Sequence, residues 1–136
     1  KDGTGLECGY AMMLKSRGDN YVLLGWLGVY PNVRGNGIGG KFLSCLREYY
    51  SALGGILLEV TKYPELEKAR KLHAFYQRNG YGDVKCEYIL YNEPAALMYL
   101  PIAGPEDISG DIRVIIRGCY LPLYTETEQK KHIDIK

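Results

Sequence analysis

The chain has 136 residues, of which 46% are hydrophobic and 24% are charged, and this is the size and apolar content of one globular domain with a single core. Its 17 Lys and Arg residues and 16 Asp and Glu residues give a net charge of +1, so it lacks the excess of basic residues that general nucleic-acid binding requires. No apolar run approaches the roughly 20 residues of a membrane span, and the N-terminal KDGTGLECGY has no apolar signal-peptide core. We therefore expect a cytoplasmic protein without nucleic-acid or membrane partners.

Cysteine and histidine form no metal-binding pattern. No CxxC pair occurs, and no His lies close in sequence to any of the four cysteines, Cys8, Cys45, Cys86 and Cys119. His73 and His132 are expected on a helix surface and in the tail. The sequence therefore predicts reduced cysteines, no disulfide framework and no metal site.

The first predicted element is a β-hairpin. Two β-prone runs, GYAMMLK and YVLLGWLGVY, flank a cluster of turn-forming residues from Ser16 to Asn20. The second run, residues 21–29, contains Gly25 and Gly28, and glycine within a strand often marks a bulge or the close approach of a ligand. We therefore expect this strand to be irregular, or to approach a ligand, at its glycines.

A helix, a strand and a second helix are predicted next. Apolar residues recur at helical spacing over about 37–53, and a pair of glycines follows as a stop signal. ILLEV, Ile56–Val60, is a continuous apolar run that predicts a strand in the interior of a sheet. Pro64 opens a second helix that should end near Gly80.

The remaining elements complete a mixed sheet. DVKCEYILY and ALMYLPI predict two more strands joined by a turn around Asn92, and a predicted helix near 108–120 precedes the charged tail TETEQKKHIDIK. The order of hairpin, helix, strand, helix and hairpin predicts an α/β (α+β) fold, in which helices pack on a mixed sheet. We divide the chain into a core, residues 1–103, and a C-terminal helical extension with a charged tail, residues 104–136.

The stretch VRGNGIGGKF concentrates four glycines and an arginine at the start of the first helix. Gly35, Gly37 and Gly40 spell G-x-G-x-x-G, and Glu59 ends the next strand, where a dinucleotide-binding fold keeps its ribose-binding acid. Two features argue against that fold: five residues separate Val29 from the first glycine, and the sheet begins and ends with antiparallel hairpins. A nucleotide-binding oxidoreductase stays an alternative that NADH titration would test.

The same stretch fits another register, R-x-x-G-x-G, over residues 34–39. Set between a strand and a helix, LGVYPNVRGNGIGGKFL resembles the acetyl-coenzyme A loop of the GNAT family of N-acetyltransferases. ILLEV followed by ARKLHAFYQRNGYGDV is similar to the family's next strand and helix. Two motifs in the family's order make this resemblance specific, and it covers about residues 7–101.

The resemblance implies a mostly antiparallel sheet in which two parallel strands, here 21–29 and 56–60, splay apart to admit the pantetheine arm of acetyl-coenzyme A. Backbone N–H groups at a helix N-terminus suit a pyrophosphate, and glycines let the backbone approach it. Gly28 would supply the local distortion of the first strand, and an ordinary packing glycine is the alternative. The implied cofactor-binding residues are Leu27, Gly28, Val29, Arg34, Gly35, Asn36, Gly37, Ile38, Gly39 and Gly40.

Two side chains are implied as catalytic. An amine attacks a thioester only after losing its proton, so the reaction requires a base. By resemblance to the GNAT enzymes that modify ribosomal-protein N-termini, which share L-E-V here, Glu59 is that base, directly or through a water. Tyr76 occupies the position of the family's general acid. A structural role for Glu59 at the strand end and a packing role for Tyr76 are the alternatives.

The chain departs from the family pattern in three places. The segment Thr61–Lys68 is longer than in many relatives, and Ala69 stands where the family often has an Asn that contacts the cofactor. The chain begins near the middle of the family fold, without the first strand and the two helices that wall the acceptor pocket. Either these elements are absent, or a partner or the segment beyond Gly104 replaces them.

The predicted function is acetyl transfer from acetyl-coenzyme A to a primary amine. The sequence does not specify the acceptor, which is a small polyamine, an amino sugar or a protein amino group, and it leaves a homodimer open. The alternative is a coenzyme A-binding sensor or interaction module without turnover, because the usual wall of the acceptor pocket is missing.

Overall fold

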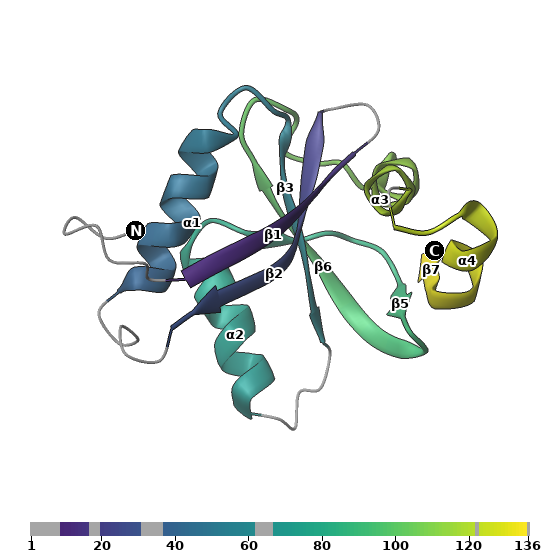
Figure 1. The fold of residues 1–136 in the computed structure, drawn as a ribbon, viewed down its shortest axis with the longest axis horizontal. Coiled ribbons are helices and arrows are strands. Elements are labelled where there is room, and N and C mark those ends of the chain that lie inside the picture. Colours follow the sequence, from purple (N-terminus) through teal and green to yellow (C-terminus); the bar gives the residue numbers. More distant parts are fainter. Residues whose placement is uncertain (1–8, 17–19, 31–36, 62–66, 122, 136) are drawn as a thin grey trace.

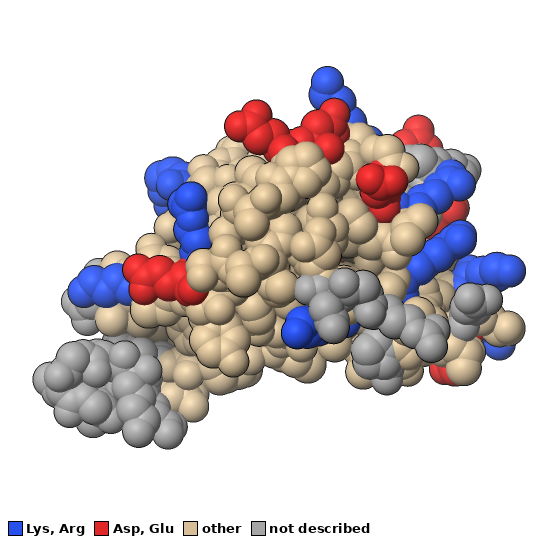
Figure 2. Space-filling view, turned by 90° about the horizontal axis from the view of Figure 1, so that it is seen from above, with Lys and Arg blue, Asp and Glu red and all other residues tan. Residues whose placement is uncertain are grey.

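A computed structural model of the chain describes residues 9–16, 20–30, 37–61, 67–121 and 123–135 (Figure 1). Its elements are β1 (Gly9–Lys15), β2 (Tyr21–Val29), α1 (Ile38–Tyr49), β3 (Gly55–Thr61), α2 (Glu67–Arg78), β4 (Gly82–Asp83), β5 (Tyr88–Leu90), β6 (Glu93–Pro101), α3 (Ile112–Tyr120), α4 (Glu126–His132) and β7 (Ile133–Ile135). Among these described residues, no helix is both long and apolar enough to cross a bilayer. On the face shown in Figure 2, basic and acidic side chains are interspersed around a broad uncharged area.

The strands form one sheet in the order β1-β2-β3-β6-β5-β7, with β4 also paired to β6. The sheet is mostly antiparallel, as predicted, and β2 and β3 form a parallel pair. Their pairing ends at Leu24 beside Leu58, whereas β2 stays paired with β1 as far as Val29 and β3 stays paired with β6 as far as Thr61. The two strands therefore splay apart, and the predicted splay is confirmed.

β2 carries a bulge at the point where the splay begins. The register between the first two strands shifts between Met12 and Met13 of β1, so Gly25 of β2 has no partner on that strand. A Cβ atom at Gly25 would lie 2.9 Å from the Met12 Cε atom, the end of a flexible side chain, so a larger residue there would displace Met12. The distortion that the resemblance assigns to Gly28 thus lies at Gly25.

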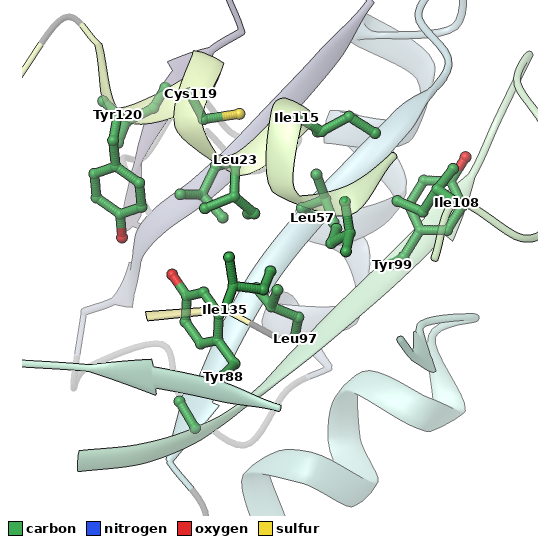
Figure 3. Packing of buried hydrophobic residues seen from close by; sticks show 14 residues of the cluster. Leu23, Leu57, Tyr88, Leu97, Tyr99, Ile108, Ile115, Cys119, Tyr120 and Ile135 are labelled. Carbon is green, nitrogen blue, oxygen red and sulfur yellow. The ribbon is translucent and has the colours of Figure 1, made fainter. Parts of the chain in front are cut away.

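Different helices pack on the two faces of the sheet. Side chains alternate along β3, so Leu58 and Val60 point to one face while Leu57 and Glu59 point to the other. The first, which we call the α1–α2 face, buries Val22, Leu24, Leu43, Ile56, Leu58, Val60, Tyr76, Tyr81, Met98 and Leu100. The second, which we call the α3 face, buries Leu14, Leu23, Leu57, Tyr88, Ala95, Leu97, Tyr99, Ile108, Ile112, Ile115, Ile116, Cys119, Tyr120 and Ile135 (Figure 3).

The segment after Gly104 is built into the α3 face. The helix predicted near 108–120 begins at Ile112, and it packs its apolar side on the sheet. The charged tail forms α4, whose N-terminus has a capping box of Thr125 and Glu128, and then β7, which pairs with β5. The C-terminal segment therefore covers the face of the sheet on which Glu59 lies.

Candidate active site

The splay between β2 and β3 opens next to Glu59. Leu58 is the last residue of β3 that pairs with β2, so Glu59 is the first residue of β3 beside the gap. On the other side of the gap lie the strand residues implied as cofactor-binding, Leu27, Gly28 and Val29. The Leu27 side chain packs against the α1–α2 face, and the Tyr10 ring lies against Gly28. Backbone from two diverging strands therefore borders the gap, and Glu59 stands where it begins.

The N-terminus of α1 presents N–H groups that no side chain of a described residue caps. Its N-cap residue, Gly37, has a φ of 71°, in the left-handed region that favours glycine. The first turn holds no acidic residue, and a Cβ atom at Gly37 would have no described atom within 4 Å. Because the first N–H groups of a helix lack intrahelical partners and attract anions, this end of α1 fits a phosphate group.

Gly39 and Gly40 also have a packing reason to be glycine. A Cβ atom at Gly39 would lie 3.0 Å from the Phe75 ring of α2, and one at Gly40 would lie 3.4 Å from the Asn79 Oδ1. The Asn79 amide in turn donates to the Phe75 carbonyl at 2.8 Å. The two glycines therefore allow α1 and α2 to pack closely. Ile38 is the first residue of α1, and Arg34, Gly35 and Asn36 lie outside the described residues.

Glu59 accepts a hydrogen bond at each carboxylate oxygen. The Tyr120 hydroxyl of α3 donates to Oε1 at 2.7 Å, and the Tyr88 hydroxyl of β5 donates to Oε2. Figure 3 shows the two hydroxyls pointing toward one another. Burial raises the pKa of Glu59, and the two hydrogen bonds oppose this rise because they favour the ionised form. A carboxylate whose pKa is raised toward neutrality is suited to act as a general base.

Tyr76 lies on the α1–α2 face. The residue is 7% exposed, and its ring centroid lies 5.3 Å from that of Phe75 and 5.7 Å from that of Tyr81. Its hydroxyl has no hydrogen-bond partner among the described residues. Burial raises the pKa of Tyr76, so the phenol stays protonated at neutral pH. The group can therefore donate a proton to a ligand.

The structure places Glu59 and Tyr76 on opposite faces of the sheet. Tyr76 belongs to the buried cluster of the α1–α2 face, which also contains Val60, the neighbour of Glu59 in β3. Glu59 contacts the α3 face instead.

Tyr88 and Tyr120 are functional candidates that the sequence analysis misses. The chain contains 13 tyrosines, and nothing in the spacing of these two points to Glu59. One usable signal is that Tyr120 lies on the buried side of an amphipathic helix, where a hydroxyl requires a hydrogen-bond partner. That signal predicts a buried polar partner without identifying it.

A cavity of about 670 Å³ lies elsewhere, between α3, α4 and β7. Arg113, Arg117, Lys130 and Lys131 line it, and none of the implied catalytic or cofactor-binding residues does. Lys130 and Lys131 lie in the last turn of α4, where positive charge offsets the negative end of the helix dipole. Across the described parts of the chain, no group of three or more His, Cys, Asp or Glu residues could hold a metal ion.

Comparison with known proteins gives a consistent picture. A family model described as an acetyltransferase (GNAT) domain matches residues 1–82, and no curated protein matches the sequence. A protein from Bacteroides thetaiotaomicron, described as an acetyltransferase of the GNAT family, is 24% identical with a TM-score of 0.72, over 91% of this chain and 70% of that one. The ribosomal-protein-S18-alanine N-acetyltransferase from Escherichia coli is 19% identical with a TM-score of 0.59, over 79% and 68% of the two chains. A protein from Bacillus anthracis, described as a streptothricin acetyltransferase in complex with acetyl coenzyme A, is 20% identical with a TM-score of 0.56, over 69% and 55%.

Proposed function

Because this chain belongs to the GNAT acetyltransferase domain family and is therefore an acyltransferase, we propose that it transfers an acetyl group from acetyl-coenzyme A to a primary amine of a small molecule or a protein. The observation that carries the proposal is the gap between β2 and β3, which begins beside a buried carboxylate. The N-terminus of α1, which no side chain of a described residue caps, supports it.

In this proposal the chain binds acetyl-coenzyme A, which supplies the acetyl group as a thioester. The N–H groups of Ile38, Gly39 and Gly40 hold the pyrophosphate, and Arg34 adds a cation whose fork matches phosphate oxygens. The backbone of residues 27–29 hydrogen-bonds the pantetheine amides as an added strand would. The relative from Bacillus anthracis, described in complex with acetyl coenzyme A, supports this choice of cosubstrate.

Glu59 is the proposed general base. An acceptor amine is protonated near neutral pH and has no free lone pair until a base removes that proton. Each carboxylate oxygen has two lone-pair positions, so Glu59 keeps one free position per oxygen beside its tyrosine hydrogen bonds. It takes the proton of the amine directly or through a water.

Tyr76 is the proposed general acid. Its hydroxyl lies on the α1–α2 face with no described partner, and burial raises its pKa, so it carries a proton at the pH of the reaction. It gives that proton to the sulfur as the carbon–sulfur bond breaks. The base and the acid thus act from opposite faces of the sheet, on a thioester held in the gap between them.

A coenzyme A-binding module without turnover is the second candidate. Two observations favour it: both oxygens of Glu59 already accept hydrogen bonds, and α3 and β7 cover the face of the sheet where an acceptor would approach. In this role Glu59 is a structural carboxylate, and acetyl-coenzyme A binds as a signal.

Release of the coenzyme A thiol separates the two candidates. The purified chain is mixed with acetyl-coenzyme A and, in parallel, with a polyamine, an amino sugar and peptides with free N-termini. Thiol release that depends on one of these amines supports acetyl transfer. Binding of acetyl-coenzyme A with no amine-dependent release across the panel supports the binding module.

We place this reaction in the cytoplasm, a setting that suits the free cysteines Cys45 and Cys119. We also include a homodimer in the proposal, and light scattering of the purified chain measures its mass. A mass equal to that of one chain would exclude the homodimer and leave the proposed chemistry unchanged.

A further inference from the structure

We infer that Tyr120 and Tyr88 are positioning residues for Glu59, so that the segment after Gly104 supplies part of the active site. The inference rests on the proposed function, in which Glu59 is the general base. Neither tyrosine is implied by the family resemblance. Tyr120 belongs to α3, which follows the predicted core of residues 1–103.

The geometry fixes the carboxylate from two sides. The Tyr120 hydroxyl reaches Oε1 from α3 at 2.7 Å, and the Tyr88 hydroxyl reaches Oε2 from β5. Tyr120 is 6% exposed and Tyr88 is 2% exposed, so close packing of the rings holds both hydroxyls in place. Donors on both oxygens restrict the rotation of the carboxylate and leave its remaining lone pairs in defined directions.

The hydrogen bonds also favour the charged form of the base. Burial of Glu59 raises its pKa, whereas the bonds from Tyr88 and Tyr120 lower it. A base must be ionised to accept a proton, so the two tyrosines keep Glu59 usable at neutral pH although it is buried. Removal of either hydroxyl should therefore raise the pKa of Glu59.

The other titratable groups around Glu59 stay neutral at working pH. Burial raises the pKa of the Cys119 thiol of α3 to about 12. A hydrogen bond with Tyr124 is the main cause that raises the pKa of Tyr91, in the turn between β5 and β6, to about 12. Burial raises the pKa of Tyr88 and of Tyr120 as well. The His132 ring lies 5.1 Å from the Tyr91 ring, so the titration has to be read from the Glu59 carboxyl carbon itself.

The test is the pKa of Glu59 in Tyr120→Phe, read from the side-chain carboxyl carbon by NMR in protein labelled with ¹³C-glutamate. We expect a rise of roughly one pH unit, because a hydrogen bond to a charged group is lost. The acid limb of kcat/KM should move to higher pH by the same amount, with turnover recovered at alkaline pH. Tyr124→Phe is the matched control, because Tyr124 stacks on Tyr120 and its hydroxyl bonds to Tyr91.

Tyr88→Phe is the second variant, and it keeps the test decisive if Tyr120→Phe does not fold. A carboxyl pKa equal to that of the parent in the folded variants would overturn the inference, and so would an equal shift in Tyr124→Phe. The NMR readout needs no turnover. If Glu59→Gln retains full activity, the proposed base is wrong, while the carboxyl titration still decides whether the tyrosines hold Glu59.

Discussion

The two faces of the sheet bury similar apolar clusters but differ in how their polar groups are satisfied. On the α3 face, Glu59 has a tyrosine donor on each oxygen. On the α1–α2 face, the hydroxyls of Tyr76 and Tyr81 have no hydrogen-bond partner among the described residues. In the proposed reaction, Glu59 on one face is the proton acceptor and Tyr76 on the other face is the proton donor.

The largest expected effect on turnover comes from removing the Glu59 carboxylate, the proposed proton acceptor. Glu59→Gln keeps the shape of the side chain but takes up no proton, so turnover should fall by roughly 10² to 10⁴ with acetyl-coenzyme A affinity nearly unchanged. Steady-state kinetics and calorimetry measure the two quantities. Glu48→Gln, on the exposed surface of α1, is the control and should match the parent. Unchanged turnover at neutral pH would assign Glu59 to structure.

The second largest effect is expected from removing the Tyr76 hydroxyl, the proposed proton donor on the opposite face. Tyr76→Phe keeps the ring and its packing, so a packing role predicts little change, whereas an acid role predicts a fall in turnover of roughly 10² to 10³. The falling alkaline limb of the pH profile should also disappear. Tyr81→Phe is the matched control, because it removes a neighbouring buried hydroxyl without a described partner. If Tyr76→Phe keeps more than half of the parent turnover, Tyr76 is not the acid.

A smaller effect is expected at the N-terminus of α1. Asn tolerates the left-handed backbone of Gly37 and extends into the open space beside it, so Gly37→Asn should keep the fold and weaken acetyl-coenzyme A binding about tenfold or more. Calorimetry measures the affinity. Gly110→Asn, at another glycine with open space, serves as the control. An affinity within a few-fold of the parent would exclude this helix end as the phosphate site.

The smallest effect concerns stability. Burial raises the folded-state pKa of Glu59 above its unfolded value, so its favourable contribution is present in acid and is lost as pH rises through the folded pKa. Glu59→Gln does not titrate, so its free energy of unfolding relative to the parent should increase between about pH 4 and pH 7. Urea denaturation at the two pH values measures this. A relative stability that falls over the same range would contradict the raised pKa.

Much of this arrangement follows from local sequence patterns. The apolar periodicity after the glycine-rich stretch and the ILLEV run predict the helix and an interior strand, whereas the parallel pair and its splay are implied by the resemblance to the GNAT family. Alternation along ILLEV is enough to put Glu59 on the face opposite Leu58. The helix, the strand and the alternation depend on residues close together in the chain, which is why the sequence predicts them. By contrast, α1 ends at Tyr49, before the predicted 53.

The partners of Glu59 could not be predicted, because they depend on tertiary packing. Tyr88 and Tyr120 lie 29 and 61 residues from Glu59 in the chain. The position of the bulge depends on the register between β1 and β2, which the sequence alone leaves open between Gly25 and Gly28. Helix α4 could not be predicted either, because the tail is charged and shows no apolar periodicity. In the structure this helix buries Gln129.

The central claim is that acetyl-coenzyme A occupies the gap between β2 and β3, and NMR of ¹⁵N-labelled protein tests it without an acceptor. On titration with acetyl-coenzyme A, we predict the largest amide shift changes at three places: the start of α1 over residues 38–40, residues 27–29 of β2, and residues 59–60 of β3. Changes confined to one of the two strands, or gathered around the cavity between α3, α4 and β7, would contradict the account.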